Sequence, residues 1–197
     1  MGAVTKVKGG WAVSDDQLYQ RYLTGDQTAG DALMLRYGDA VTAYLDAILH
    51  NAQDAEDLML DCFTVILVDK PKIMEGHFRS YLFKVARNKA NRLWKIRFRR
   101  GEFSLDESLG ETLQANGDDP EDNVLKTERS AILEKCLNRI APQYREGLWL
   151  VYMMGQSHAE AAEIMGCGLK RVENLLYNGK KQLRLELEKE GITHADI

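Results

Sequence analysis

The sequence predicts an all-α protein made of two small helical domains, and three observations support this prediction. Apolar residues recur every three or four positions almost throughout the chain, which is the spacing of amphipathic helices. No segment alternates apolar and polar residues with the β-branched enrichment that is typical of strands. Residues 101–125 hold eight acids, three glycines, one proline and no base, which is the composition of a flexible acidic linker. We therefore expect a disordered N-terminus over residues 1–13, helical domains over 14–100 and 126–190, and a C-terminal tail over 191–197.

The first domain is expected to contain four helices. Ser14 and Gln17 have the spacing of a capping box, which opens the first helix. The next three helices are expected to begin near Gln27, Asp54 and Phe78. Their apolar faces are expected to consist, in chain order, of Leu33, Tyr37, Val41, Tyr44, Leu45 and Ile48; of Ala55, Leu58, Cys62, Phe63 and Ile66; and of Leu82, Val85, Ala86 and Leu93.

The second domain has the pattern of a helix-turn-helix. An amphipathic helix is expected around residues 132–140, and Pro142 is placed to start a second helix whose apolar face holds Leu148, Val151 and Tyr152. Ser157 and Glu160 then form a second capping box before a short helix. A turn at residues 166–168 separates this helix from a longer one, which carries Val172, Leu175, Leu176 and Leu183 on its apolar side.

Charge is distributed unevenly along the chain, although its net value is only -4. Residues 78–100 hold nine Lys or Arg and no acid, so the remaining 17 bases and 30 acids give the rest of the chain a charge of -13. Such a basic stretch indicates phosphate binding, and a merely solvated helix face is the alternative. Aromatic residues interleave with these charges, as they do where proteins stack unpaired bases. They are Phe78, Tyr81, Phe83, Trp94 and Phe98, and for Tyr81 and Trp94 burial in the core is an equal alternative.

The remaining composition favours a binding protein over an enzyme. No apolar run reaches the roughly 18 to 20 residues that span a bilayer, and the first residues lack the apolar stretch of a signal peptide, so we expect a cytoplasmic protein without membrane insertion. Cys62, Cys136 and Cys167 are expected to be reduced thiols in the core, with a redox or metal role as the alternative. The four histidines lack metal-ligand spacing, and we find no phosphate-binding loop or nucleophile elbow. We therefore expect no catalytic residues, no cofactor, no metal and no small-molecule substrate.

Most of residues 15–184 resembles the extracytoplasmic-function sigma factors of bacteria. Residues 15–45, 54–63 and 78–100 resemble region two of that family, and residues 133–184 resemble its region four, in the family's order. The resemblance implies a transcription-initiation subunit that brings core RNA polymerase to promoter DNA and helps to melt it. It also implies an anti-sigma factor as a further partner.

The resemblance assigns a role to particular residues of this chain. The polymerase-binding residues it implies are Asp54, Glu56, Asp57, Leu58 and Asp61. For the minus-ten element it implies Arg87, Asn88, Asn91, Arg92 and Lys95, and it implies the loop from Lys70 to His77, with Lys72, for the capture of a flipped base. The basic helix with its interleaved aromatic residues adds Arg79, Tyr81 and Trp94 to the residues predicted to bind this element. The residues the resemblance implies for the minus-thirty-five element are Ser157, Lys170, Arg171, Glu173, Asn174, Asn178 and Lys181.

The chain departs from the family's usual residues at four of its positions. Leu60 stands where the family often has a polymerase-contacting Gln. Arg171 and Glu173 replace a usual Thr and a frequent Lys on the helix that reads the minus-thirty-five element. Gly179 replaces a common Ala, at a cost of about 1 kcal/mol in helix propensity. Two alternatives remain: a stand-alone helix-turn-helix regulator, and a sigma-like adaptor that does not bind promoters.

Overall fold

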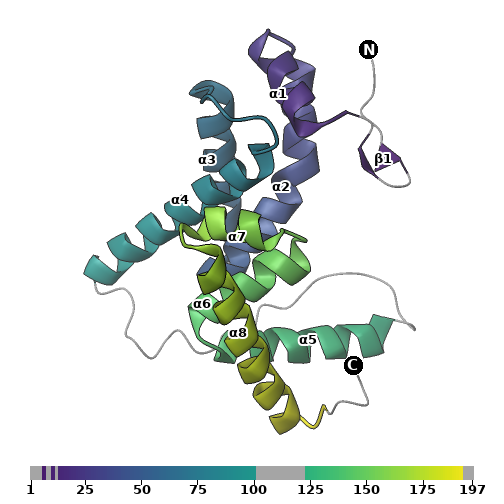
Figure 1. Cartoon of the computed structure of the whole chain (residues 1–197), viewed down its shortest axis with the longest axis vertical. Coiled ribbons are helices and arrows are strands. Elements are labelled where there is room, and N and C mark those ends of the chain that lie inside the picture. The colour runs from purple at the N-terminus through teal and green to yellow at the C-terminus, as the bar shows by residue number, and fades with distance from the viewer. Residues whose placement is uncertain (1–5, 8–9, 12, 101–122, 193–197) are drawn as a thin grey trace. The chain divides into compact units, whose positions relative to one another are not determined.

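The computed structural model describes residues 6–7, 10–11, 13–100 and 123–192 (Figure 1). Within these residues the chain divides into two compact units, with the division falling in helix α4 after Trp94. The first unit contains α1 to α3, most of α4 and the last three residues of α7, Glu163–Met165. The second unit contains α5, α6, α8 and the remaining parts of α4 and α7. The predicted all-α fold is confirmed, whereas the predicted linker lies outside the described residues except for its last three positions.

Two very short strands precede the first helix. Strand β1, Lys6–Val7, pairs antiparallel with β2, Gly10–Trp11, so that Lys6 lies opposite Trp11. Both strands fall within residues 1–13, for which the sequence predicts disorder, and the other residues there lie outside the described part except Val13.

The four helices of the first unit begin where local signals place them. They are α1 Asp15–Leu23, α2 Gln27–Leu49, α3 Ala52–Val68 and α4 Phe78–Arg100. The predicted capping box opens α1, because the Gln17 N–H donates to the Ser14 hydroxyl at 3.2 Å and the Ser14 N–H donates to the Gln17 side chain at 3.1 Å. Helix α3 begins two residues before the predicted Asp54, because the Asn51 side chain accepts from the Asp54 N–H at 2.9 Å and caps the helix.

The core of the first unit is aliphatic and aromatic. Helix α2 packs against both α1 and α3 (Figure 1). Tyr44 of α2 meets Phe83 of α4 edge-on, with ring centroids 5.4 Å apart. Phe78 lies between Tyr19 and Tyr37, with centroids at 5.4 and 6.0 Å. The other fully buried side chains of this unit include Leu18, Leu33, Val41, Leu45, Phe63, Ile66 and Leu82.

The second unit consists of four α-helices and one π-helical segment. They are α5 Asn123–Arg139, α6 Pro142–Leu148, η1 Trp149–Met153, α7 His158–Met165 and α8 Leu169–Lys189. Helix α5 begins three residues before the predicted domain boundary at 126. Pro142 occupies the start of α6, as predicted, because its fixed φ suits the first helical position.

The π-helical segment overturns part of the predicted apolar face. In η1 the chain gains a residue per turn, which shifts the side chains that follow relative to a 3.6-residue period. Leu148, which precedes the segment, is buried as predicted, whereas within the segment Leu150 is buried, Val151 is half-buried and Tyr152 is 53% exposed. The prediction that Tyr152 faces the core is wrong for this reason.

Helix α8 is held against α5 and α6. A Cβ atom at Gly179 would lie only 3.2 Å from Cβ of Tyr144 and 3.3 Å from Leu148, so the glycine lets α8 approach α6 closely. At the far end of α8, Arg139 and Lys135 of α5 pair with Glu190 at 2.6 and 3.1 Å. Their hydrogen bonds lower the pKa of Glu190 below its usual value. These contacts fix the rotation of α8 and therefore determine which of its residues are exposed.

Candidate functional site

An acidic face lies on α3. Glu56, Asp57 and Asp61 are exposed there, and Leu60 is 52% exposed between them. The Lys89 ammonium on α4 donates to the Asp61 carboxylate at 3.2 Å. The other two predicted residues, Asp54 and Leu58, are half-buried at the edge of this face.

The loop of residues 69–77 connects α3 to α4 and is fastened to α1. The Tyr19 hydroxyl donates to the carbonyl oxygen of Pro71 at 2.7 Å, and the Gly76 N–H donates to the Asp16 carboxylate at 2.9 Å. Lys70 has a positive φ of 47° and places its ammonium 5.1 Å from the centroid of the Tyr22 ring. Burial, helped by the nearby Tyr81, raises the pKa of Tyr19 to about 12, so its hydroxyl remains a donor at neutral pH. The loop is therefore positioned by contacts that the sequence analysis did not anticipate.

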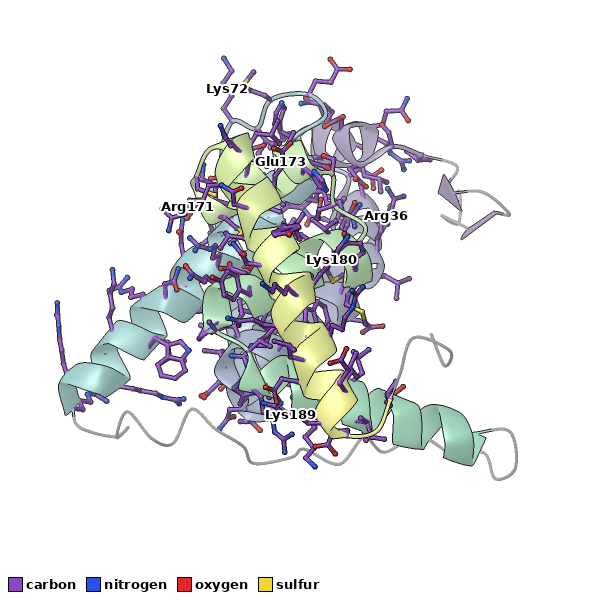
Figure 2. The ribbon with its side chains drawn as sticks, turned by 60° about the horizontal axis from the view of Figure 1, so that its bottom comes forward. Arg36, Lys72, Arg171, Glu173, Lys180 and Lys189 are labelled. Atoms are coloured by element: carbon purple, nitrogen blue, oxygen red, sulfur yellow. The ribbon has the colours of Figure 1, made fainter. Side chains whose placement is uncertain are left out.

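A cleft of about 670 Å³ lies between this loop and α1. Its lining includes Tyr19, which also holds the loop, and the loop residues Ile73 and Glu75. The remaining lining residues are Val13, Asp16, Gln17, Gln20 and Arg21. The predicted loop residues Lys70, Lys72 and His77 are exposed but do not line the cleft, and Figure 2 shows the Lys72 side chain extending from the outer edge of the loop.

Helix α4 presents a continuous basic face. Asn88, Arg92 and Lys95 are exposed at intervals of three or four residues, and Asn91 is exposed beside them. Lys84 and Arg99 extend the same face by a turn at each end, although neither was predicted. The predicted residues Arg79 and Arg87 are half-buried at its margin.

The aromatic residues of α4 divide into two groups. Phe78 and Phe83 are 1% and 0% exposed within the first unit, so their proposed role as stacking residues is wrong. Tyr81 and Trp94 are half-buried, and the Trp94 ring N–H approaches the carbonyl oxygen of Ile48 at 3.4 Å. Both rings therefore keep part of their surface accessible, while the side chain of Phe98 lies outside the described residues.

Helices α7 and α8 form the predicted helix-turn-helix. Ser157 caps α7, because the Glu160 N–H donates to its hydroxyl at 3.2 Å and the Ser157 N–H donates to the Glu160 carboxylate at 2.7 Å. Gly166 adopts a φ of 63°, which a residue with a side chain rarely adopts, and so permits the turn after α7. On α8, Val172 and Leu176 are buried and fix the orientation of the helix.

The predicted residues of α8 are all exposed. They are Lys170, Arg171, Glu173, Asn174, Asn178 and Lys181. Figure 2 shows Arg171 and Glu173 near the beginning of α8, with Lys180 further along it. Lys180 lies 4.7 Å from the centroid of the Tyr152 ring. None of the six predicted side chains pairs with another described residue, so all six are available to a ligand.

Two of the three cysteines lie in the core, and the third lies nearer the surface. Cys62 and Cys136 are fully buried, and burial raises the pKa of Cys62 to about 12 and that of Cys136 above its usual value. Cys167 is half-buried in the turn before α8. Among the described residues no three His, Cys, Asp or Glu side chains are grouped to hold a metal ion.

We expect Cys167 to react first with a thiol reagent on the native protein. Cys62 and Cys136 are buried and disfavour the reactive thiolate, so they should react only on unfolding. Titration with a chromogenic disulfide should detect one rapidly reacting thiol in native buffer and three thiols in denaturant. Cys167→Ser should abolish the rapid phase, and a rapid phase that persists in this variant would contradict the assignment.

No helix within the described residues has both the length and the apolar composition that crossing a membrane requires.

The chain is similar to known sigma factors over most of its length. The family model described as Sigma-70, region 4, matches residues 130–183. The chain is 30% identical over 171 residues to the ECF RNA polymerase sigma factor BldN of Streptomyces coelicolor, which is 85% of this chain and 63% of that protein. It is 25% identical over 186 residues to the RNA polymerase sigma-H factor of Pseudomonas aeruginosa, which is 88% of this chain and 94% of that protein. The chain thus spans less than two thirds of BldN and nearly all of the sigma-H factor.

Solved structures share the fold. CnrH, solved in complex with the cytosolic domain of CnrY, superimposes with a TM-score of 0.65 at 22% identity, over 89% of this chain and 97% of that one. The sigma factor RpoE of Bartonella quintana, solved with the anti-sigma factor NepR, gives a TM-score of 0.66 at 21% identity, over 80% and 96% of the two chains. The family model covers the helix-turn-helix of α7 and α8, and the solved structures share the helical fold. The chain therefore belongs to the extracytoplasmic-function family of RNA polymerase sigma factors.

Proposed function

We propose that this protein is a dissociable sigma subunit that directs core RNA polymerase to promoters and assists their melting. The observation that carries the proposal is that one chain combines an acidic face on α3 with two separate DNA-binding candidates, on α4 and α8. A repressor or activator that binds DNA alone has no use for the first of these surfaces. The protein would act by binding, without catalysis of its own, and in the cytoplasm where the polymerase and the promoters are.

The first unit would bind polymerase through α3 and the minus-ten element through α4 and the loop of residues 69–77. The basic face of α4 supplies positive charge for phosphates. The accessible parts of Tyr81 and Trp94 suit the stacking of unpaired bases, which contributes about 1 to 3 kcal/mol per base. That is enough to offset the few kcal/mol that unstacking costs. The loop beside the cleft would hold a base that has left the duplex.

The second unit would read the minus-thirty-five element. The exposed side chains of α8 include types that bond guanine, adenine and cytosine edges in the major groove. Ser157, at the N-terminus of α7, would contact a phosphate. An anti-sigma factor is a further expected partner, since the Bartonella quintana RpoE, which shares the fold, was solved with the anti-sigma factor NepR.

Reconstitution with core polymerase distinguishes this function from both alternatives. The purified chain, added to core polymerase and promoter fragments, should support initiation that neither component supports alone. A stand-alone regulator would bind duplex DNA without polymerase and would not support initiation. A sigma-like adaptor would bind polymerase and leave promoter recognition unchanged.

Asp57→Arg should weaken the complex with core polymerase by at least about tenfold, equivalent to ~1.4 kcal/mol. Asp57 is exposed at the centre of the acidic face of α3, so reversing its charge should disturb the partner contact and leave the fold intact. Fluorescence polarisation with labelled protein measures the affinity. Glu188→Arg, which reverses an exposed acid near the end of α8, is the matched control and should bind as the original chain does. Equal affinity of the two variants would place the polymerase contact elsewhere.

Arg92→Ala should reduce promoter affinity of the holoenzyme almost equally for all sequences. Arg92 is exposed on the basic face of α4 and is expected to neutralise one phosphate, so the slope of log K against log salt should shrink by about 1. Filter binding at several salt concentrations measures the slope. The control is Lys189→Ala, which removes an exposed base near the end of α8, far along the chain from α4. Lys189 pairs with Glu186 of the same helix, and its loss should leave the slope unchanged. A sequence-dependent loss with Arg92→Ala would instead indicate a base contact.

A further inference from the structure

The most exposed apolar side chain of α8 is Tyr177, which is not among the residues predicted to bind DNA. Its exposed fraction is 73%, against 49% for Leu169 and 50% for Leu185 on the same helix. Its hydroxyl and ring have no partner among the described residues. Tyr177 therefore contributes nothing visible to the packing of the second unit, and a large ring in water needs another explanation.

Tyr177 lies on the same face as the predicted base-reading residues. Leu169, Glu173 and Tyr177 follow one another at intervals of four residues, so they form one row along α8. The row covers ~12 Å along the axis, which is about the width of the major groove. Asn174 and Asn178 lie beside this row and are exposed as well. A helix that enters the groove with this face would bring the Tyr177 ring to the base edges.

The chemistry of the surrounding face indicates what the ring would contact. Residues 169–184 hold five Lys or Arg and one acid, so phosphates already have cations to pair with. The ring is the one large apolar group in the middle of this face, since Leu169 lies at its first residue and Leu185 beyond its last predicted contact. In the major groove the bases present donors and acceptors, and the only apolar group is the 5-methyl of thymine.

We propose that Tyr177 is a specificity-determining residue whose ring packs on the 5-methyl group of a thymine in the minus-thirty-five element, next to the base pair that Glu173 contacts. This assignment rests on the proposed function as a sigma factor. It adds a hydrophobic contact to the predicted polar ones. This contact raises the affinity for thymine over cytosine at one position. The tyrosine hydroxyl is not required for it.

The test compares thymine with deoxyuridine, which lacks only the methyl group. The preferred minus-thirty-five sequence is first selected by the holoenzyme from a promoter library randomised in that element. Each thymine of the selected sequence is then replaced singly by deoxyuridine, and the affinity of holoenzymes with the original chain, Tyr177→Phe and Tyr177→Ser is measured. At one position, deoxyuridine should lower the affinity of the original chain and of Tyr177→Phe by about fourfold, the effect of losing one buried methyl group. Tyr177→Ser should bind thymine and deoxyuridine equally at that position.

The experiment distinguishes an error in the assignment of Tyr177 from an error in the proposed function. If the holoenzyme enriches no sequence in the library, the proposed function is refuted and the assignment with it. If the original chain and Tyr177→Ser enrich the same sequences with the same sensitivity to deoxyuridine, only the assignment to Tyr177 is refuted. If Tyr177→Phe loses as much affinity as Tyr177→Ser on every sequence, the hydroxyl contacts a phosphate and the ring reads no base. Circular dichroism of both variants should match the original chain, because the side chain is exposed.

Discussion

Gly30→Ala is expected to destabilise the first unit by about 1 to 3 kcal/mol, the usual cost of inserting a methyl group into a packed site. Intrinsic helix propensity favours the opposite outcome, since alanine is preferred over glycine inside a helix by about 1 kcal/mol. A Cβ atom at position 30 would, however, lie 2.8 and 2.9 Å from two carbons of the Tyr22 ring. That ring cannot easily move, because it is buried and its hydroxyl donates to the carbonyl oxygen of Leu67 at 2.6 Å. The steric conflict should therefore exceed the gain in propensity.

Gly38→Ala provides the matched control for this prediction. Gly38 lies in the same helix, α2, and a Cβ atom there would have no neighbour within 4 Å. This substitution should stabilise the unit by about 0.5 to 1 kcal/mol. Urea unfolding of the full chain, followed by circular dichroism, should place the two variants on opposite sides of the original midpoint. If both variants are stabilised, the Tyr22 ring accommodates the methyl group and does not constrain the end of α3.

The helices were predictable because their signals are local. The face of α2 from Leu33 to Leu45 is set by the 3.6-residue period, and both capping boxes involve residues only three positions apart. The two-residue error at the start of α3 was avoidable, since Asn51 is a preferred N-cap residue. The π-helical segment η1 was not predictable, because no residue type in Trp149–Met153 marks the extra residue in the turn.

The contacts that position the loop of residues 69–77 depend on residues far apart in the sequence. Tyr19 and Tyr22 bond carbonyl oxygens of Pro71 and Leu67, which are 52 and 45 positions away. Every residue has a backbone carbonyl, so the sequence does not indicate which carbonyl oxygen each tyrosine hydroxyl bonds. The burial of Phe78 and Phe83 was likewise undetermined, because an aromatic residue beside a basic one suits both a core and a base-stacking surface.

The predicted residues of α8 were placed correctly on exposed faces because Val172 and Leu176 define the buried one. Tyr177 follows from the same geometry, yet a large aromatic residue is usually assigned to a core. Its position one residue beyond Leu176 was the available signal. The same reasoning would have extended the basic face of α4 to Lys84 and Arg99.

The ion pair between Arg36 and Asp15 is expected to contribute strongly to stability, because it joins α2 to the start of α1 in a mostly buried place. The Arg36 side chain is 4% exposed and that of Asp15 is 24% exposed. Arg36 also donates to the carbonyl oxygen of Val13 at 2.8 Å, and the Tyr37 hydroxyl donates to Asp15 at 2.5 Å. Burial and the bond to Asp15 raise the pKa of Tyr37, so this hydroxyl stays protonated across the physiological range.

Arg36→Met should therefore lower the free energy of unfolding of the first unit by about 3 kcal/mol, since removing one partner of a buried pair leaves the other charge uncompensated. Methionine retains much of the length of the side chain, which limits the cavity. Arg21→Met is the matched control, because Arg21 pairs with Asp26 at 2.6 Å but is 44% exposed, and it should change stability little. Urea unfolding in 0.1 and 0.5 M salt measures both effects, and the loss in Arg36→Met should persist at high salt because solvent ions screen a buried pair poorly. Equal losses in the two variants would show that the Asp15 carboxylate is sufficiently stabilised by water and Tyr37, and that Arg36 acts mainly through the packing of its aliphatic stem.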